Sequence, residues 1–361
     1  MSQLRTQSSG LRDYGRSLLR VAVCVLISEL CVLSPELAWA DNSNVGTSGA
    51  AFLKIGPGAR AVGMGEAYTG VADDIDAIYW NPAGLATIKN PEIEGMHMQY
   101  FQSILYEYAA FAYPTTSYGT WGMAITNLYT NDLQARTQDT DAPTGTFSAN
   151  DSAYWLSYAY PITSKLSLGA NMKYIHQSLS DTASTAYAAD GGVLYDTGWR
   201  DVKVGASVQN VGSQVKFANE SDPLPLTGRI GASVPVLNKS LLLSSDVILP
   251  RDNDAALALG GEYTGRLIDG LRYALRTGYQ TGSTVDGLSG ISAGGGLTFG
   301  RVSFDFAWVP FGELGNTYRY AIHVKFGQPD QKNLTDAPHD TLKQADATRM
   351  NDASLEQLLT Y

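Results

Sequence analysis

The chain has 361 residues, of which 44% are hydrophobic and 17% are charged, and its formal net charge is −10 at pH 7. This acidic balance argues against nucleic acid as a partner, because binding to phosphates requires clustered lysine and arginine. A chain of this length suits either two soluble domains or one large all-β barrel. The hydrophobic pattern therefore has to decide between them.

The first forty residues are organised like a secretory signal peptide. Four arginines are followed by the apolar run VAVCVLISELCVL, and Ala38-Trp39-Ala40 fits a small-x-small cleavage site. We therefore expect residues 1–40 to be removed by cleavage between Ala40 and Asp41. The run is shorter than the ~20 residues of a helical membrane span. Glu29 within the run is unusual for a signal peptide, and a retained membrane anchor is the alternative.

Removal of this segment also fixes the chemistry of the mature chain. Cys24 and Cys31, the two cysteines, both lie within it, so we expect no disulfide and no cysteine-based metal site. The segment holds four of the 25 basic and three of the 35 acidic side chains, which leaves a net charge of −11. The four histidines are scattered, and neither a metal nor a cofactor is predicted.

After residue 90 the sequence alternates between apolar and polar residues. The alternation is clearest in RVSFDFAWV (301–309) and TYRYAIHVKF (317–326), where one face is apolar and the other polar or charged. Segments of about ten residues suit tilted strands that cross a bilayer better than the shorter strands of soluble sheets. Fourteen strands are predicted: 92–101, 104–114, 118–128, 152–161, 165–177, 185–195, 200–210, 225–235, 239–249, 255–264, 271–280, 288–299, 301–309 and 317–326.

The connections support the same architecture, because outer-membrane barrels alternate short periplasmic turns with longer external loops. PTTSYG, PITSK, DTGWR, VLNKS and Gly300-Arg301 are short, whereas 129–151, 211–224 and 281–287 are long and polar. TGRLIDG, which by its place in the alternation should be a short periplasmic turn, is somewhat long. The prediction is an all-β, 14-stranded antiparallel transmembrane β-barrel over residues 91–326, in the outer membrane of a bacterial cell and in contact with its lipid.

Two blocks resemble a known family. GTSGAAFLKIGPGARAVGMGEAYTGVADDIDAIYWNPAGLA (46–86) and FDFAWVPFGELGNTYRYAIHVKF (304–326) are similar to the PorV/PorQ-type outer-membrane proteins, which are relatives of the FadL-like hydrophobic-compound transporters. The resemblance implies a fourteen-stranded barrel whose N-terminal segment, residues 41–90, folds into the lumen as a hatch. It also implies that the protein is not an enzyme.

Within the hatch, the glycines at 56, 58, 63 and 65 would allow close backbone packing in a crowded lumen. The proposed hatch motif comprises Asp73, Asp74, Asp76, Trp80, Asn81, Pro82, Ala83 and Gly84. Its aspartates need cationic partners in a partly dry lumen, and alternation places Lys173 and Lys203 on the inward face of their strands. The other charges predicted to face the lumen are Arg229, Arg272, Arg276, Asp305, Arg319, His323 and Lys325.

Two enzyme-like motifs are rejected. Residues 56–61, GPGARA, match a dinucleotide fingerprint, but no βαβ alternation follows. Residues 290–294 fit the GxSxG pattern, with Asp305 and His323 in hydrolase order. A tight turn at 300–301 pairs Asp305 with Gly296 and leaves Ser292 roughly 13 Å further along its strand. No catalytic residue is predicted.

Residues 327–361 form a polar tail that we expect to be a disordered periplasmic arm. Two functions remain for a plugged barrel. The first is an accessory role in protein export across the outer membrane, as the PorV resemblance implies, with secretion-system components or exported proteins as partners. The alternative is a passive FadL-like channel for a small hydrophobic ligand. If 46–86 lay outside the lumen, a partner-binding role for that stretch would follow instead.

Overall fold

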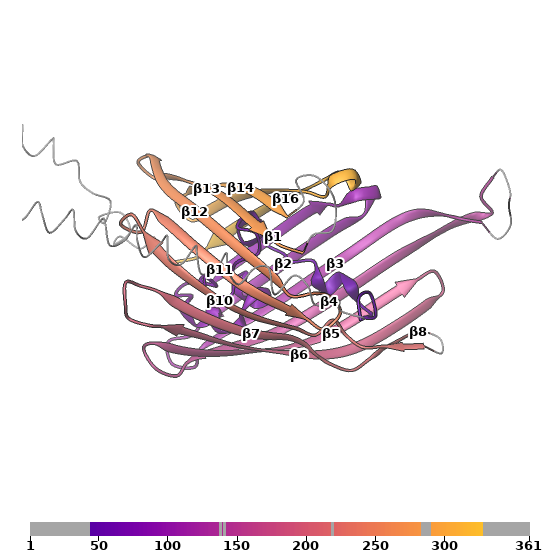
Figure 1. Cartoon of the computed structure of the whole chain (residues 1–361), viewed down its shortest axis with the longest axis horizontal. Helices are drawn as coiled ribbons and strands as arrows, with labels where there is room; N and C mark the ends of the chain where they lie inside the picture. Colours follow the sequence, from indigo (N-terminus) through magenta and orange to yellow (C-terminus); the bar gives the residue numbers. More distant parts are fainter. Residues whose placement is uncertain (1–43, 137–138, 140–141, 218–219, 283–289, 328–361) are drawn as a thin grey trace, which may run out of the picture. The chain divides into compact units, whose positions relative to one another are not determined.

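The computed structural model describes residues 44–136, 139, 142–217, 220–282 and 290–327. The cleavage site at Ala40 and Asp41 and the tail beyond residue 327 lie outside the described residues. Within the described ranges, fourteen strands close into one antiparallel barrel in the order β1-β16-β15-β14-β13-β12-β11-β10-β7-β6-β5-β4-β3-β2 (Figure 1). A separate hairpin pairs β8 (Val215–Phe217) with β9 (Glu220–Asp222).

The barrel strands are β1 (Glu92–Gln99), β2 (Leu105–Pro114), β3 (Thr120–Ala135), β4 (Gly145–Pro161), β5 (Leu166–Leu179), β6 (Thr182–Asp196), β7 (Lys203–Gly212), β10 (Thr227–Val236), β11 (Leu241–Pro250), β12 (Ala256–Ile268), β13 (Leu271–Gln280), β14 (Ile291–Phe299), β15 (Val302–Pro310) and β16 (Asn316–Lys325). Each of the fourteen predicted segments overlaps one of them. The predicted barrel is therefore confirmed.

Two details of the prediction were wrong. Much of the polar stretch 129–151 belongs to β3 and β4, which pair with each other as far as Ala135 and Gly145. Strand pairing needs only backbone hydrogen bonds, so the ladder continues where the apolar pattern stops. TGRLIDG is not a long connection either, because β12 and β13 are separated only by Asp269 and Gly270.

The strand faces separate by residue type. Large apolar side chains on the outward face are exposed, among them Met123, Leu156 and Met172, and strand register aligns these three in one row across β3, β4 and β5. Inward side chains on the same strands are buried. An apolar belt of this kind is stable when it faces lipid. Among the described residues, no helix is both long and apolar enough to span a membrane.

The orientation of β15 makes a testable prediction about insertion. Phe306 points outward and packs near Tyr320, whereas Asp305 points inward. We expect Phe306→Arg to lower the free energy of unfolding of the barrel, measured in lipid vesicles, by about 2–4 kcal/mol if the position lies at mid-membrane. Phe306→Leu is the control and should change it much less. Asp305→Asn should also be costly, because Asp305 forms a buried ion pair with Arg276.

The segment before β1 forms four short helical elements: η1 (Ala51–Lys54), α2 (Ala59–Gly63), α3 (Ala77–Trp80) and η2 (Pro82–Thr87). Helix α2 packs against β13, β14, β15 and β16, while η2 packs against β2 through β6. Contacts with strands all around a closed barrel place this segment, the hatch, in the lumen. The core lies between hatch and wall, and its largest fully buried side chains include Trp80, Tyr68, Met64, Ile75, Leu85, Tyr106, Met98 and Ile175.

Candidate functional site: the hatch in the lumen

The hatch backbone is irregular, so its carbonyl groups need partners outside the hatch. Polar side chains from the wall supply them. Asn171 of β5 donates to Ile78 O at 2.7 Å and Ser207 of β7 donates to Trp80 O at 3.0 Å. The other donor–acceptor pairs are Gln209 to Tyr79 O at 2.5 Å, Ser233 to Gly70 O at 2.8 Å and Arg229 to Glu66 O at 2.6 Å. The wall thus holds the hatch through its main chain.

Two wall residues accept hydrogen bonds from hatch amides. Asp246 Oδ2 of β11 accepts from the backbone N–H groups of Tyr68 and Thr69, at 3.2 and 3.0 Å, and from the Thr69 hydroxyl at 2.5 Å. Ser292 Oγ of β14 accepts from Gly65 N at 2.9 Å. These acceptors lie on β11 and β14, whereas Asn171 lies on β5, which is opposite β14 in the closed strand order, so the hatch is anchored to both sides of the barrel.

The second half of the hatch motif forms a compact turn. Asn81 Oδ1 accepts from Ala83 N at 3.2 Å and so caps η2, which begins at Pro82. The Asn81 amide nitrogen donates to Thr69 O and to Val193 O of β6, at 2.9 and 3.0 Å. An added Cβ on Gly84 would collide with the Ala72 carbonyl. Only glycine fits there without a shift of the backbone.

Trp80 fills the centre of the hatch. It is fully buried, its indole nitrogen donates to Pro57 O at 3.1 Å, and the Arg229 guanidinium lies 4.8 Å from its ring centroid. Its ring covers Gly56, where an added Cβ would overlap the indole. The close packing predicted for the hatch glycines is present at this position, and Trp80 is the side chain that requires it.

The acidic half of the motif is paired differently from the prediction. Asp73 and Asp74 both bind the Arg60 guanidinium, at 2.6 and 2.8 Å, and Arg60 belongs to the hatch itself. Arg60 also binds Glu262 of β12 at 2.9 Å, so the wall contributes an acid here and not a cation. Burial alone would raise the pKa of Asp74, but Arg60 and the Tyr68 hydroxyl outweigh it and hold this pKa at about 2.

Asp76 has no cationic partner within hydrogen-bonding distance among the described residues. It is buried, its carboxyl interacts with that of Glu94 in β1, and its Oδ1 has no hydrogen bond to any described residue. Burial and then the Asp74 carboxylate raise the pKa of Asp76 well above its ordinary value. The three aspartates therefore differ: two pair with Arg60, and Asp76 favours its protonated form.

This difference predicts a pH response. A raised folded-state pKa stabilises the folded hatch fully below the unfolded value of ~3.9, and the stabilisation is lost as pH rises through the raised pKa. We expect hatch protection from added protease to fall as pH is raised. Asp76→Asn should remove this component of the pH response, while Asp73→Asn should retain it. An identical pH profile in wild type and Asp76→Asn would contradict the assignment.

The predicted lumen-facing charges lie at several sites. Arg276 of β13 binds Glu262 and Asp305, at 2.6 and 2.5 Å. Glu92 of β1 lies 3.0 Å from His323 and 3.1 Å from Lys325. The remaining positions are occupied by Arg229, which contacts Glu66 O, by the buried Arg319, and by the exposed Arg272. Most wall cations that face the lumen thus bind wall acids or hatch carbonyls, and not the three aspartates.

The wall also approaches the hatch backbone directly. An added Cβ on Gly260, which faces inward from β12, would lie 2.5 Å from Met64 O, whereas on the outward Gly261 its nearest neighbour would be Leu243 at 3.8 Å. We therefore expect Gly260→Val to destabilise the packing of the hatch against the barrel wall by about 1–3 kcal/mol. Gly261→Val is the matched control. Limited proteolysis of the hatch measures the difference, and equal cleavage of the two variants would contradict this packing.

The enzyme-like motifs have structural roles. Ser292 binds the hatch, Asp305 binds Arg276 and His323 binds Glu92, so the three are not arranged as a triad. Asp305 pairs with Gly296, as the sequence predicted. Within the described ranges, no three His, Cys, Asp or Glu side chains are grouped as metal ligands.

Sequence reasoning missed the centre of the ion-pair cluster. Arg60 lies within GPGARA, where only the glycine spacing was considered. Its position 13 residues before Asp73 gave no local helical signal. The carbonyl-binding residues on the wall were also missed, since a Ser, Asn or Gln on the inward face of a strand carries no specific motif. Their one shared signal is polarity at inward positions near a segment of irregular backbone.

Comparisons with known proteins agree with the fold. Residues 39–194 match the model of an uncharacterised protein family, UPF0164. No curated protein matches the chain. The CymD monoaromatic hydrocarbon channel is similar in structure, with 11% identity over 76% of this chain and 98% of that chain and a TM-score of 0.53. The P. putida toluene transporter TodX has 10% identity over 76% and 99% of the two chains and a TM-score of 0.51. The chain therefore has the barrel fold of these hydrocarbon channels.

Proposed function

We propose that the protein is a non-enzymatic outer-membrane channel that passes small hydrophobic compounds and is gated by its N-terminal hatch. The observation that carries this proposal is the fold, a fourteen-stranded barrel like those of two hydrocarbon channels, with an apolar outward belt. The hatch fills the lumen between opposite walls and excludes free flow of hydrophilic solutes.

The hatch contacts support gating by local rearrangement. Several of its anchors are single hydrogen bonds from separate wall side chains, such as Asn171, Ser207 and Ser233. Each such bond contributes only about 0.5–1.5 kcal/mol net. Part of the hatch can therefore shift without disrupting the strand ladder, whose backbone bonds do not involve it.

Uptake tests the proposal. Cells that produce the protein should take up a labelled monoaromatic hydrocarbon faster than cells without it, and should not take up a hydrophilic sugar of similar size faster. A variant lacking residues 46–86 should admit both. Unchanged hydrocarbon uptake, with the barrel shown to be in the outer membrane, would exclude the channel function.

A second function, accessory to protein export, is favoured by a different observation. The resemblance of 46–86 to the PorV type falls on the residues that seal the lumen: Arg60 with its acids, and Asn81 bonded to the wall. A sealed barrel suits a structural partner of a secretion system. Deleting the gene in its host and comparing the exported proteins tests this role. Loss of exported proteins with unchanged hydrocarbon uptake would support it over the channel.

A further inference from the structure

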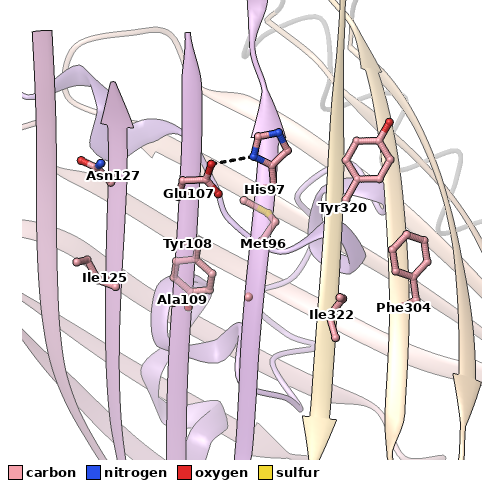
Figure 2. Close-up of a pocket in the computed structure, with 11 residues that line it drawn as sticks. Met96, His97, Glu107, Tyr108, Ala109, Ile125, Asn127, Phe304, Tyr320 and Ile322 are labelled. Atoms are coloured by element: carbon pink, nitrogen blue, oxygen red, sulfur yellow. Dashed lines mark hydrogen bonds and ion pairs between the residues drawn. The ribbon is translucent and has the colours of Figure 1, made fainter. Parts of the chain in front are cut away.

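An open hollow of about 550 Å³ lies on the outward side of the wall, over β1, β2, β3, β15 and β16 (Figure 2). We call it the outer hollow. Its floor contains Gly95 and Ala109, which are paired in register on β1 and β2. An added Cβ on Gly95 would meet no atom within 4 Å. The outward layer of side chains is therefore missing here, while Ile125, Phe304 and Ile322 form apolar sides.

One end of the outer hollow is polar. His97 Nδ1 lies 2.8 Å from Glu107 Oε1, and both side chains are about half exposed on the outward face. Asn127 is the next residue in the same row, paired in register with Glu107. Figure 2 shows these three side chains together at one end and Ile125, Ala109 and Ile322 further along the strands. An acid–base pair on a lipid-facing surface is costly and usually functional.

The three polar groups retain binding capacity. Nδ1 of His97 lies against Glu107 and donates to its carboxylate; Nε2 makes no bond to a described residue and is a donor in the imidazolium form of the ring. The second carboxylate oxygen of Glu107 is also without a bond to any described residue. Asn127 accepts from Ser152 at its carbonyl oxygen, which leaves its amide nitrogen as a donor. Two donors beside one acceptor carrying a negative charge match a ligand that has an anionic and a cationic group close together.

We propose that the outer hollow binds one phospholipid with a phosphoethanolamine head group. An acyl chain lies over Gly95 and Ala109, the phosphate accepts hydrogen bonds from the Asn127 amide and from Nε2–H of the His97 imidazolium, and the ammonium binds Glu107. The size agrees with the ~300–1,000 Å³ of typical small-molecule sites. A fatty acid is a poorer match, because its single carboxylate would lie beside Glu107 with no compensating ammonium. This site rests on the outer-membrane placement of the proposed function, and not on passage or export.

Native mass spectrometry of the full chain in detergent tests the site, with phosphatidylethanolamine and phosphatidylglycerol of the same acyl chains as probes. We expect phosphatidylethanolamine to bind at the lower concentration. Gly95→Ile fills the hollow with a residue that suits a strand, and it should weaken binding by about 15- to 60-fold, since it displaces two or three methylene groups of the chain at ~0.8 kcal/mol each. Gly261→Ile, on the outward face of β12, should bind as the wild type does.

The head-group contacts have a separate readout. Glu107→Gln should lose the preference for phosphatidylethanolamine over phosphatidylglycerol while still binding both. Equal binding by wild type and Gly95→Ile, equal affinity for the two lipids in the wild type, or occupation of the outer hollow by a hydrocarbon but by neither lipid would each overturn the proposal. Failure of hydrocarbon uptake leaves these results unaffected. Failure of outer-membrane placement is detected independently, by recovery of the chain in the soluble fraction.

Discussion

Deleting residues 46–86 should convert a closed barrel into a conducting one. The strand ladder closes on itself from β1 to β16, so barrel formation does not need hatch hydrogen bonds. The hatch occupies the lumen and bonds to β5, β7, β10, β11 and β14. Its removal should open a water-filled path, measured as stepwise conductance in planar bilayers where the wild type shows little.

The deletion also removes half of the core. Met98, Tyr106 and Ile175 of the wall are fully buried against the hatch and would become exposed to the lumen. We therefore expect the deleted barrel to unfold at lower temperature, and heat-modifiable migration in gels should establish that it has formed before conductance is compared. An intact deleted barrel with wild-type conductance would mean that the hatch is not the barrier.

A milder variant loosens the attachment of the hatch without removing the hatch from the lumen. Asn171→Ala, Ser207→Ala and Ser233→Ala together remove three bonds to hatch carbonyls while the hatch remains in place. Conductance should rise in brief events and stay below that of the deletion. The destabilisation of the hatch should exceed the net value of three weak hydrogen bonds. Each variant leaves a hatch carbonyl without a partner where water has limited access, and an unpaired buried acceptor carries its own cost.

The barrel could be predicted from sequence because its cause is local. Alternation in 301–309 and 317–326 fixes which side chains face outward, and a two-residue turn fixes the register that pairs Asp305 with Gly296. The partners of the hatch aspartates could not be predicted in this way. Alternation identifies an inward residue, but it gives neither the height nor the side of the lumen that an irregular segment will reach.

The outer hollow could not be predicted from the sequence either. Gly95 and Ala109 are ordinary small residues within alternating strands, and His97 and Glu107 are unremarkable singly. They become a site only when the register of β1 and β2 aligns them. Such pairings depend on contacts between strands, and a single strand does not contain that information.

The ion-pair cluster makes the largest single-residue prediction. Arg60 binds Asp73, Asp74 and Glu262, and all of these groups except Asp73 are largely shielded from water. Arg60→Met keeps the apolar stem but leaves three carboxylates, of which Glu262 alone retains a cation, Arg276. Breaking a buried pair in this way costs about 3–5 kcal/mol, so the hatch should be released and conductance should approach that of the deletion.

The controls for Arg60 separate charge from geometry and from packing. Arg60→Lys keeps the charge but loses the planar fork that binds several carboxylates, so it should open the barrel partly. Asp73→Asn with Asp74→Asn, introduced into Arg60→Met, should restore closure by removing the repulsion. The pKa of Asp74 rises once Arg60 is absent, so acid pH should protonate it and reduce the conductance of Arg60→Met. If Arg60→Met instead stays closed at neutral pH with its barrel intact, the hatch is held by its main-chain bonds alone and the cluster contributes little to closure.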